Sequence, residues 1–391
     1  MGGFCDSLIL NSISGEVRGI NMLTEHRVFI KDAREASELD DASIDIAVTS
    51  PPYPMISMWD DLFMGMNGAI GHALEKQDGR TAYALMHGEL DRVWEELYRV
   101  LKEGAFACIN IGDAVRTLGD RFQLYSNHAR IQEKMFTLGF DLLPVILWRK
   151  QTNVPNKFMG SGMLPAGAYV TLEHEYILIF RKGAKRAFHT AEEKLKRQQS
   201  AFFWEERNAW YSDLWDFKGT RQEQSGEKLR KRSGAFPLLL PLRLINMYSQ
   251  IGDTVLDPFL GTGTTTLAAM ACGRNSVGYE LDGNFAPPLR EKMLRTPLSL
   301  NSYNLERLKA HHDFVFHRTA LKGPLKYCNE FFDFPVMTAQ EQKMKLVFLK
   351  KVEELKENHY RALYLDDEKA RKFGAGFGRL ELPMLKQLDR A

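Results

Sequence analysis

The chain has 391 residues, of which 44% are hydrophobic and 26% charged, and its formal net charge is +2. These values are typical of a folded globular protein and exclude disordered, fibrous and uniformly basic chains, so any surface for nucleic acid must be local. The four cysteines are far apart without CxxC spacing, and no run of about 18 apolar residues occurs. We therefore expect a cytoplasmic protein without disulfides, cysteine-bound metal or a membrane span.

The first part of the chain predicts a strand, a short helix and a second strand. The two strands are expected in residues 26–32 (HRVFIKD) and 43–53 (SIDIAVTSPPY), and the second ends at a double proline. Residues 54–90 are expected to form a helical insertion or lid. A helix that ends at Gly104 and a buried strand at 105–112 (AFACINIG) complete this stretch.

The alternation of helices and strands continues and is then interrupted. We expect a helix around residues 126–138 and strands at 140–150 and 174–182. Residues 184–233 have no clear strand pattern and are dense in basic and aromatic side chains. This segment is therefore predicted to be an insertion between two α/β halves.

The second half predicts another strand–helix–strand unit. A helix is expected within residues 236–250, followed by a strand at 254–257 (TVLD), a glycine-rich turn, a helix, and a strand that ends at Glu280. The tail from about residue 300 has one plausible amphipathic helix, near residues 338–363. His311 and His312 have no other ligand cluster nearby, so we expect no metal site there.

The glycine-rich turn has the pattern of a site for an adenosine-containing ligand. Gly261 and Gly263 allow close backbone approach, the following helix offers its N-terminus to an anionic group, and Glu280 can accept hydrogen bonds from ribose hydroxyls. A dinucleotide site requires a third glycine where the chain has Thr266, and the GK[ST] of a phosphate loop is also missing. S-Adenosylmethionine has no phosphate, and Asp257 can favour its ammonium and sulfonium charges. A turn without a ligand remains the alternative.

The double proline predicts a loop that binds an amino group. Pro51 and Pro52 fix the backbone and lack N–H donors, so carbonyl oxygens can face a substrate without competition. We expect the Ser50 hydroxyl and the Pro51 carbonyl to accept the two hydrogens of an exocyclic base amino group, while Tyr53 stacks on the base. This arrangement aims the nitrogen lone pair at a methyl donor. A simple turn or a polyproline ligand is the alternative for these four residues taken alone.

Together, TSPPY after a strand and DPFLGTGTT before a strand ending in glutamate resemble the amino methyltransferases of DNA, in the permuted order with the catalytic motif first. The resemblance covers roughly residues 26–290. It implies an α/β, Rossmann-like fold of S-adenosylmethionine-dependent methyltransferases, with a mostly parallel sheet and a small target-recognition insertion. The implied cofactor-binding residues are Asp32, Phe236, Pro237, Asp257, Pro258, Phe259, Gly261, Gly263, Thr264 and Glu280.

On this resemblance the chain divides into four parts. They are a catalytic half at 1–183, a target-recognition insertion at 184–233, a cofactor-binding half at 234–300, and a C-terminal extension of unknown role at 301–391.

Serine at position 50 is typical of the family members that methylate N4 of cytosine, as in restriction-modification systems, whereas adenine enzymes usually have Asp or Asn there. Adenine N6 remains the first alternative, because N1 of adenine is an acceptor as N3 of cytosine is. Methylation at C5 of cytosine is disfavoured, since no cysteine follows a proline. A base inside a duplex must be flipped out to reach such a loop.

The basic stretch within the insertion is the best candidate for DNA contacts. Basic side chains there would bind phosphates of double-stranded DNA, and the alternative is a solvated surface. The resemblance leaves open a cognate restriction endonuclease that acts on the same site. An RNA amino methyltransferase and a non-catalytic nucleic-acid-binding protein of the same fold are further alternatives. The predicted DNA contacts are Arg186, Arg197, Arg221, Arg230, Lys231 and Arg232.

Overall fold

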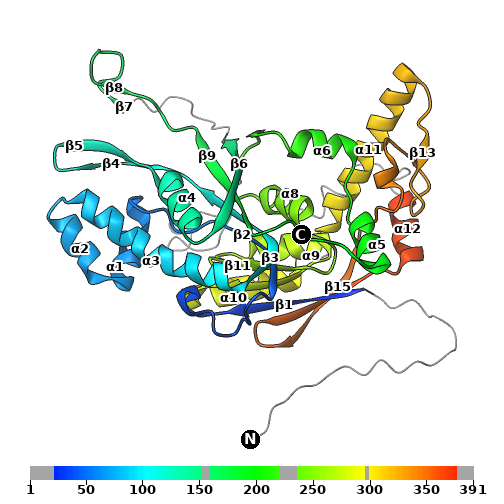
Figure 1. Cartoon of the computed structure of the whole chain (residues 1–391), viewed down its shortest axis with the longest axis horizontal. Helices are drawn as coiled ribbons and strands as arrows, with labels where there is room; N and C mark the ends of the chain where they lie inside the picture. The colour runs from blue at the N-terminus through cyan, green and yellow to red at the C-terminus, as the bar shows by residue number, and fades with distance from the viewer. Residues whose placement is uncertain (1–21, 151–158, 220–235, 296–298, 377–391) are drawn as a thin grey trace, which may run out of the picture.

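The computed structural model describes residues 22–150, 159–219, 236–295 and 299–376, and within these ranges ten strands form one mixed sheet (Figure 1). From one edge to the other the strands are β10 (Leu214–Asp216), β6 (Phe140–Arg149), β9 (His174–Lys182), β3 (Leu101–Ile111), β2 (Ile44–Thr49), β11 (Thr254–Asp257), β12 (Asn275–Tyr279), β1 (Leu23–Phe29), β16 (His359–Tyr364) and β15 (Leu349–Lys356). The five neighbouring strands from β3 to β1 in this order run parallel to one another.

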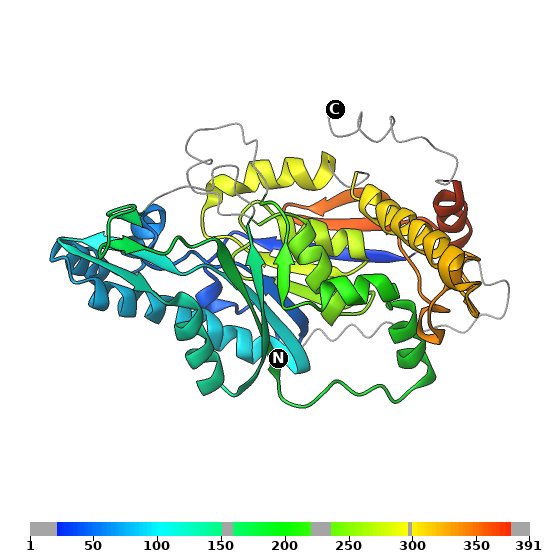
Figure 2. The same ribbon diagram turned by 90° about the horizontal axis from the view of Figure 1, so that it is seen from above.

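Helices cover both faces of the sheet, as the two perpendicular views show (Figure 2). One face packs against α1 (Asp60–Met66), α2 (Gly68–Glu75), α3 (Gly79–Val100) and α4 (Asn127–Thr137). The other face packs against α8 (Leu239–Tyr248), α9 (Thr264–Cys272) and α10 (Ala286–Arg295).

Strand β9 shows why the inner strands of the sheet are continuous apolar runs. Ile177 and Ile179 point into the core beneath α8 and α9, whereas Leu178 and Phe180 point into the core beneath α3 and α4. Because both faces are covered, successive side chains are all buried, as expected for a sheet with helices on both sides.

Shorter elements surround this framework. None of the helices within the described ranges has the length and apolar character needed to cross a membrane. The remaining elements are η1 (Ala33–Glu35), η2 (Ser57–Trp59), β4 (Ala114–Leu118), β5 (Arg121–Tyr125), β7 (Met159–Gly160), β8 (Ala168–Tyr169), α5 (Ala191–Gln199), α6 (Trp204–Trp210), η3 (Gly283–Phe285), α11 (Asn301–Lys322), β13 (Tyr327–Cys328), β14 (Pro335–Val336), η4 (Ala339–Glu341) and α12 (Asp367–Gly376).

Most of the expected elements are confirmed, with small shifts at their ends. The predicted strands at 140–150, 174–182 and 254–257 are β6, β9 and β11, and residues 54–90 are largely helical. The helix expected to end at Gly104 ends at Val100, and β3 begins directly after it.

The amphipathic helix predicted near residues 338–363 is wrong, because most of this stretch is the hairpin β15–β16. On β16, Tyr360, Ala362 and Tyr364 alternate as buried residues, and the strand pairs with β1 at the sheet edge. Asn358 in the turn has a φ of +58°. Pairing with an existing sheet edge therefore outweighs the helical propensity of the Lys- and Glu-rich β15 segment.

The described part of the predicted insertion, residues 184–219, is integrated into the main sheet and the tail. Strand β10 pairs with β6 in parallel and extends the sheet. Helix α6 contacts α11 through a buried ion pair, in which the Arg307 Nε and Glu206 Oε1 atoms are 2.5 Å apart. The described residues of this segment therefore contact both the main sheet and the tail.

Candidate active site

A cavity of about 480 Å³ opens where β2 and β11 end. These neighbouring parallel strands continue to helices on opposite faces, since β2 leads to α1–α3 and β11 leads to α9. Such a switch point leaves a crevice at the carboxyl ends of the strands, where open α/β sheets bind ligands. The predicted site residues that line the cavity are Ser50, Pro51, Pro52, Tyr53, Asp32, Phe236, Asp257, Pro258, Phe259, Gly261, Thr264 and Glu280.

Asp257 joins the catalytic loop to the cofactor loop. Its Oδ1 accepts hydrogen bonds from the Thr49 hydroxyl, at 2.6 Å, and from the Phe259 N–H, at 3.0 Å. Its Oδ2 accepts from the Thr265 hydroxyl at 2.6 Å. Burial raises the pKa of Asp257 to about 6, although these donors oppose the rise. The carboxylate thus fixes the two motif loops next to each other and, in its ionised form, contributes negative charge to the cavity wall.

The glycine turn leaves open space beside Glu280. Gly261 has a φ of +53°, and a Cβ built on it would meet no atom within 4 Å. Its N–H donates to Glu280 Oε2 at 2.8 Å, and the Asp282 N–H donates to Glu280 Oε1 at 2.8 Å. Burial raises the pKa of Glu280. Each carboxylate oxygen retains an acceptor position for a ligand hydroxyl.

Gly263 and Pro237 are not on the cavity wall. Gly263 is the N-cap of α9 and has a φ of +78°. This left-handed backbone conformation favours glycine at the start of the helix. Pro237 is buried just before α8.

These residues fit S-adenosyl-L-methionine. The cavity volume lies within the range of small-molecule sites, roughly 300–1,000 Å³. Carboxylates on its wall suit a ligand with an ammonium and a sulfonium, and Glu280 suits ribose hydroxyls. The open space at Gly261 admits a ligand close to the backbone. The acidic wall residues of this part are Asp32, Asp257, Glu280 and Asp282.

Asp32 follows β1 and is held by a neighbouring arginine that the sequence did not single out. Its Oδ2 accepts from Arg34 Nε at 2.8 Å, and Arg34 also pairs with Glu89 of α3. All three side chains line the cavity. Asp32 therefore lies on the β1 side of the cavity, and its expected position near the adenine stays a prediction.

The catalytic loop is supported by residues that sequence reasoning missed. Ser50 Oγ donates to the Tyr53 hydroxyl at 3.2 Å, and that hydroxyl donates to Glu175 Oε2 at 3.0 Å. Asn110 Nδ2 donates to the Tyr53 hydroxyl at 2.9 Å. Lys150 forms an ion pair with Glu175. Burial, together with the Glu175 carboxylate, raises the pKa of Tyr53 well above its usual value, so the phenol is a donor.

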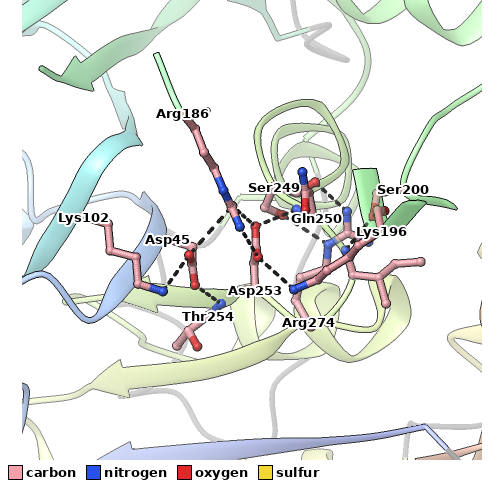
Figure 3. A network of polar contacts seen from close by, with 12 residues as sticks. Asp45, Lys102, Arg186, Lys196, Ser200, Ser249, Gln250, Asp253, Thr254 and Arg274 are labelled. Carbon is pink, nitrogen blue, oxygen red and sulfur yellow. Dashed lines mark hydrogen bonds and ion pairs between the residues drawn. The ribbon is translucent and has the colours of Figure 1, made fainter. Parts of the chain in front are cut away.

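Two of the predicted DNA-binding arginines lie at the opposite ends of the strands. Arg186 Nη1 is 2.7 Å from Asp253 Oδ2, in a network that also holds Asp45 and Lys196 (Figure 3). Arg197 lies 4.6 Å from the centre of the Phe188 ring. The geometry of Arg186 favours a structural role over the predicted DNA contact, because its guanidinium is paired with a buried carboxylate. Arg221, Arg230, Lys231 and Arg232 lie outside the described residues.

Comparison with known proteins agrees with this site. Residues 44–289 match the DNA methylase family of N6 and N4 methyltransferases. The type II methyltransferase M.MthZI of Methanothermobacter thermautotrophicus is 48% identical over 345 residues, which cover 88% of this chain and 96% of that protein. M.MjaI of Methanocaldococcus jannaschii, also a type II methyltransferase, is 48% identical over 285 residues, covering 70% of this chain and 93% of that protein.

One solved structure comes from Thermus thermophilus, is described as a putative DNA modification methylase and is complexed with S-adenosyl-L-methionine. It is 34% identical, with a TM-score of 0.52, and covers 68% of this chain and 94% of that chain. The predicted α/β methyltransferase fold and the predicted cofactor, S-adenosyl-L-methionine, are thereby confirmed. The cavity with its two joined motif loops and the match over residues 44–289 together show that the chain belongs to the N6/N4 DNA methylase family.

Proposed function

We propose that the protein methylates N4 of a cytosine that is flipped out of double-stranded DNA into the cavity. The observation that carries this proposal is the hydroxyl of Ser50, which lines the cavity at the start of the catalytic loop. Serine at this position is typical of the family members that methylate N4 of cytosine, and its oxygen can accept a hydrogen of the amino group.

The hydrogen bonds of Ser50 support its role as an acceptor. Its hydrogen is directed to the Tyr53 hydroxyl, so its lone pairs remain for an amino hydrogen of the base. The Pro51 carbonyl accepts the second amino hydrogen, and Pro52 offers no competing N–H. S-Adenosyl-L-methionine supplies an electrophilic methyl group on its sulfonium sulfur. Tyr53 stacks on the base and holds the nitrogen lone pair toward that methyl group, without a covalent enzyme intermediate.

The basic segment that follows Gly219 is proposed to hold DNA at the cavity. Gly219 and Phe236 flank residues 220–235, and both line the cavity. Basic side chains in this segment would contact phosphates of the DNA. The residues proposed for these contacts are Arg221, Arg230, Lys231 and Arg232.

The two archaeal relatives are type II methyltransferases, which supports a role in restriction-modification. The protein would then protect one DNA sequence against an endonuclease that cuts the same sequence.

Product analysis tests the proposal. The full chain is incubated with labelled S-adenosyl-L-methionine and either unmethylated genomic DNA or RNA, and the nucleosides are separated. We expect N4-methylcytosine from DNA. N6-methyladenine would contradict the choice of base, and label confined to RNA would contradict the choice of nucleic acid.

A further inference from the structure

Tyr53 is held by Asn110 and Glu175, and Lys150 pairs with Glu175. We call these three residues the Glu175 cluster. Asn110 lies at the carboxyl end of β3, Lys150 directly follows β6, and Glu175 lies at the start of β9. Because β9 runs antiparallel to both other strands, its start meets their ends. The sheet topology thus brings these side chains together beside the cavity.

The hydrogen bonds of the Tyr53 hydroxyl are complete. It donates to Glu175 Oε2 and accepts from Asn110 Nδ2 and from Ser50 Oγ. A phenol hydroxyl has one hydrogen and accepts up to two, so this set saturates it. The same hydroxyl therefore has no capacity left for a substrate, and its contacts fix the position of the ring.

The Glu175 carboxylate is itself held from several sides. Its Oε2 also accepts from Asn110 Nδ2 at 2.8 Å, and its Oε1 forms the ion pair with Lys150. The Glu175 side chain is 12% exposed, so its charge requires these partners. Lys150 Nζ lies 4.8 Å from the Trp148 ring centre, and the Trp148 Nε1–H donates to the Phe217 carbonyl at 3.0 Å. These contacts join the cluster to β6 and to the residue that follows β10.

Gly112 provides the space in which the Tyr53 ring lies. A Cβ built on Gly112 would come within 2.9 Å of Tyr53 Cε2 and 3.4 Å of Glu175 Cγ. Glycine at this position allows the ring and the carboxylate to approach the backbone just beyond β3. The ring is thus located by hydrogen bonds at its hydroxyl and by backbone contact along one edge.

We propose that the Glu175 cluster is a positioning site that holds the Tyr53 ring at the angle and depth required for stacking on the target base. This inference rests on the proposed function, since it assigns the stacking surface to Tyr53. Glu175, Asn110 and Lys150 act through Tyr53 and are positioning residues. A displacement of about 1 Å in a reacting pair can lower a rate roughly a hundredfold, so a fixed ring has a large effect on transfer.

A double-mutant cycle tests this inference. The variants are Tyr53→Phe, Glu175→Ala and the double variant, and the readout is single-turnover methyl transfer at saturating cofactor. Each single change is expected to lower the rate about tenfold, the value of one good hydrogen bond. The double variant is expected to be less than about threefold slower than the slower single variant, because both changes remove the same interaction. Losses that multiply to about a hundredfold would overturn the inference, as would full activity of Tyr53→Phe.

Two further variants separate positioning from folding and charge. Glu175→Gln retains an acceptor for the Tyr53 hydroxyl and is expected to recover most of the rate lost in Glu175→Ala. The matched control is Glu173→Gln, an exposed glutamate two residues earlier, which is expected to leave the rate unchanged. The cofactor dissociation constant should be the same in all variants, and a loss of cofactor binding in Tyr53→Phe would contradict the assignment.

The cycle is measured on whichever base the wild-type chain methylates. Transfer to adenine would therefore contradict the proposed choice of base while the cycle still tests the positioning site. A wild-type chain that transfers no methyl group to any nucleic acid would contradict both.

Discussion

The two ends of the neighbouring strands β2 and β11 differ in the partners of their buried aspartates. At the amino ends, Asp45 and Asp253 are surrounded by cations, among them Arg186 and Lys196 (Figure 3). At the carboxyl ends, Asp257 accepts hydrogen bonds from two hydroxyls and one backbone N–H, with no cation in contact among the described residues.

The contrast is sharpest along β11, where Asp253 directly precedes the strand and Asp257 is its last residue. Burial opposes ionisation at both positions. At Asp253, hydrogen bonds from Arg186 and the Gln250 N–H, with the nearby charge of Lys196, outweigh burial and lower the pKa. At Asp257 burial wins and the pKa rises to about 6. A buried charge without a protein counterion raises the free energy of the folded state. Such a charge is therefore a signature of a ligand site.

Loss of the Asp253 carboxylate should have the largest effect on stability. Asp253→Ala leaves Arg186 and Lys196 without their buried partner and removes the acceptor of the Gln250 N–H. Because both cations are partly exposed to solvent while the Gln250 N–H is buried, the expected cost is about 1–3 kcal/mol in the free energy of unfolding, which denaturant titration can measure. Cofactor affinity of the folded fraction should be retained. An Asp253→Ala variant as stable as the wild type would contradict the structural role assigned to Asp253.

Loss of the Tyr53 ring should have the largest effect on activity. Tyr53→Ala removes the stacking surface and is expected to lower single-turnover methyl transfer about a hundredfold. Its cofactor dissociation constant should stay within about twofold of wild type, because Glu280 and Asp257 belong to the cofactor motif and do not contact the Tyr53 hydroxyl. An equal loss of cofactor binding would contradict the proposal that the catalytic loop binds the base and the other loop binds the cofactor.

Asp257→Asn should weaken cofactor binding about tenfold, because it removes one negative charge beside a cationic ligand. The asparagine can preserve the contacts to Thr49 and Phe259 through its carbonyl oxygen. Calorimetry at several pH values sharpens the comparison. Since the folded pKa is about 6, wild-type affinity should fall as the pH drops through 6, and the variant should respond less. Glu280 also lines the cavity and accounts for the remaining response.

The same raised pKa has a consequence for stability. The folded state holds the Asp257 proton more tightly than the unfolded state, whose carboxyl has its ordinary pKa near 3.9. The protonated Asp257 carboxyl stabilises the folded state fully at pH values below that ordinary pKa. This stabilisation is lost as the pH rises through about 6. The stability of wild type relative to Asp257→Asn should therefore decrease across this window. An unchanged difference from pH 4 to 7 would contradict the assignment.

The smallest expected effect concerns the proposed DNA contacts. Alanine at Arg230, Lys231 and Arg232 should weaken DNA binding for all sequences and reduce the slope of log K against log salt by roughly one per contact. Fluorescence anisotropy at several salt concentrations measures this slope. A matched control replaces three exposed lysines on the edge strand β15, namely Lys350, Lys351 and Lys356. Equal slope changes in the two triple variants would contradict the proposed contacts, because they would reflect only a general loss of positive charge.

Local sequence patterns were sufficient to predict both motif loops. Ser50 to Tyr53 are contiguous, and Asp257, Gly261 and Glu280 occur within one strand–turn–helix–strand unit. The Glu175 cluster could not be predicted in this way. Asn110 lies in β3 and Glu175 in β9, 65 residues apart in the sequence, and only the antiparallel placement of β9 joins them.

The tail illustrates a second limit. Helix α11 has only a short buried stripe, which includes polar residues such as Asn304, Arg307 and His311, so its sequence has no clear apolar period. The hairpin β15–β16 forms because the edge of β1 is available, and that edge is a property of the whole fold. In such segments, pairing with the rest of the fold determines the secondary structure even where local propensity favours another one.

Single-turnover methyl transfer by Ser50→Ala tests the central claim most directly, because the proposed chemistry depends on one hydroxyl at the carboxyl end of β2. With cofactor saturated and target DNA bound, the account predicts a rate at least about tenfold below wild type and an unchanged cofactor dissociation constant. A Ser50→Ala enzyme that transfers methyl groups at the wild-type rate would contradict the role assigned to this site.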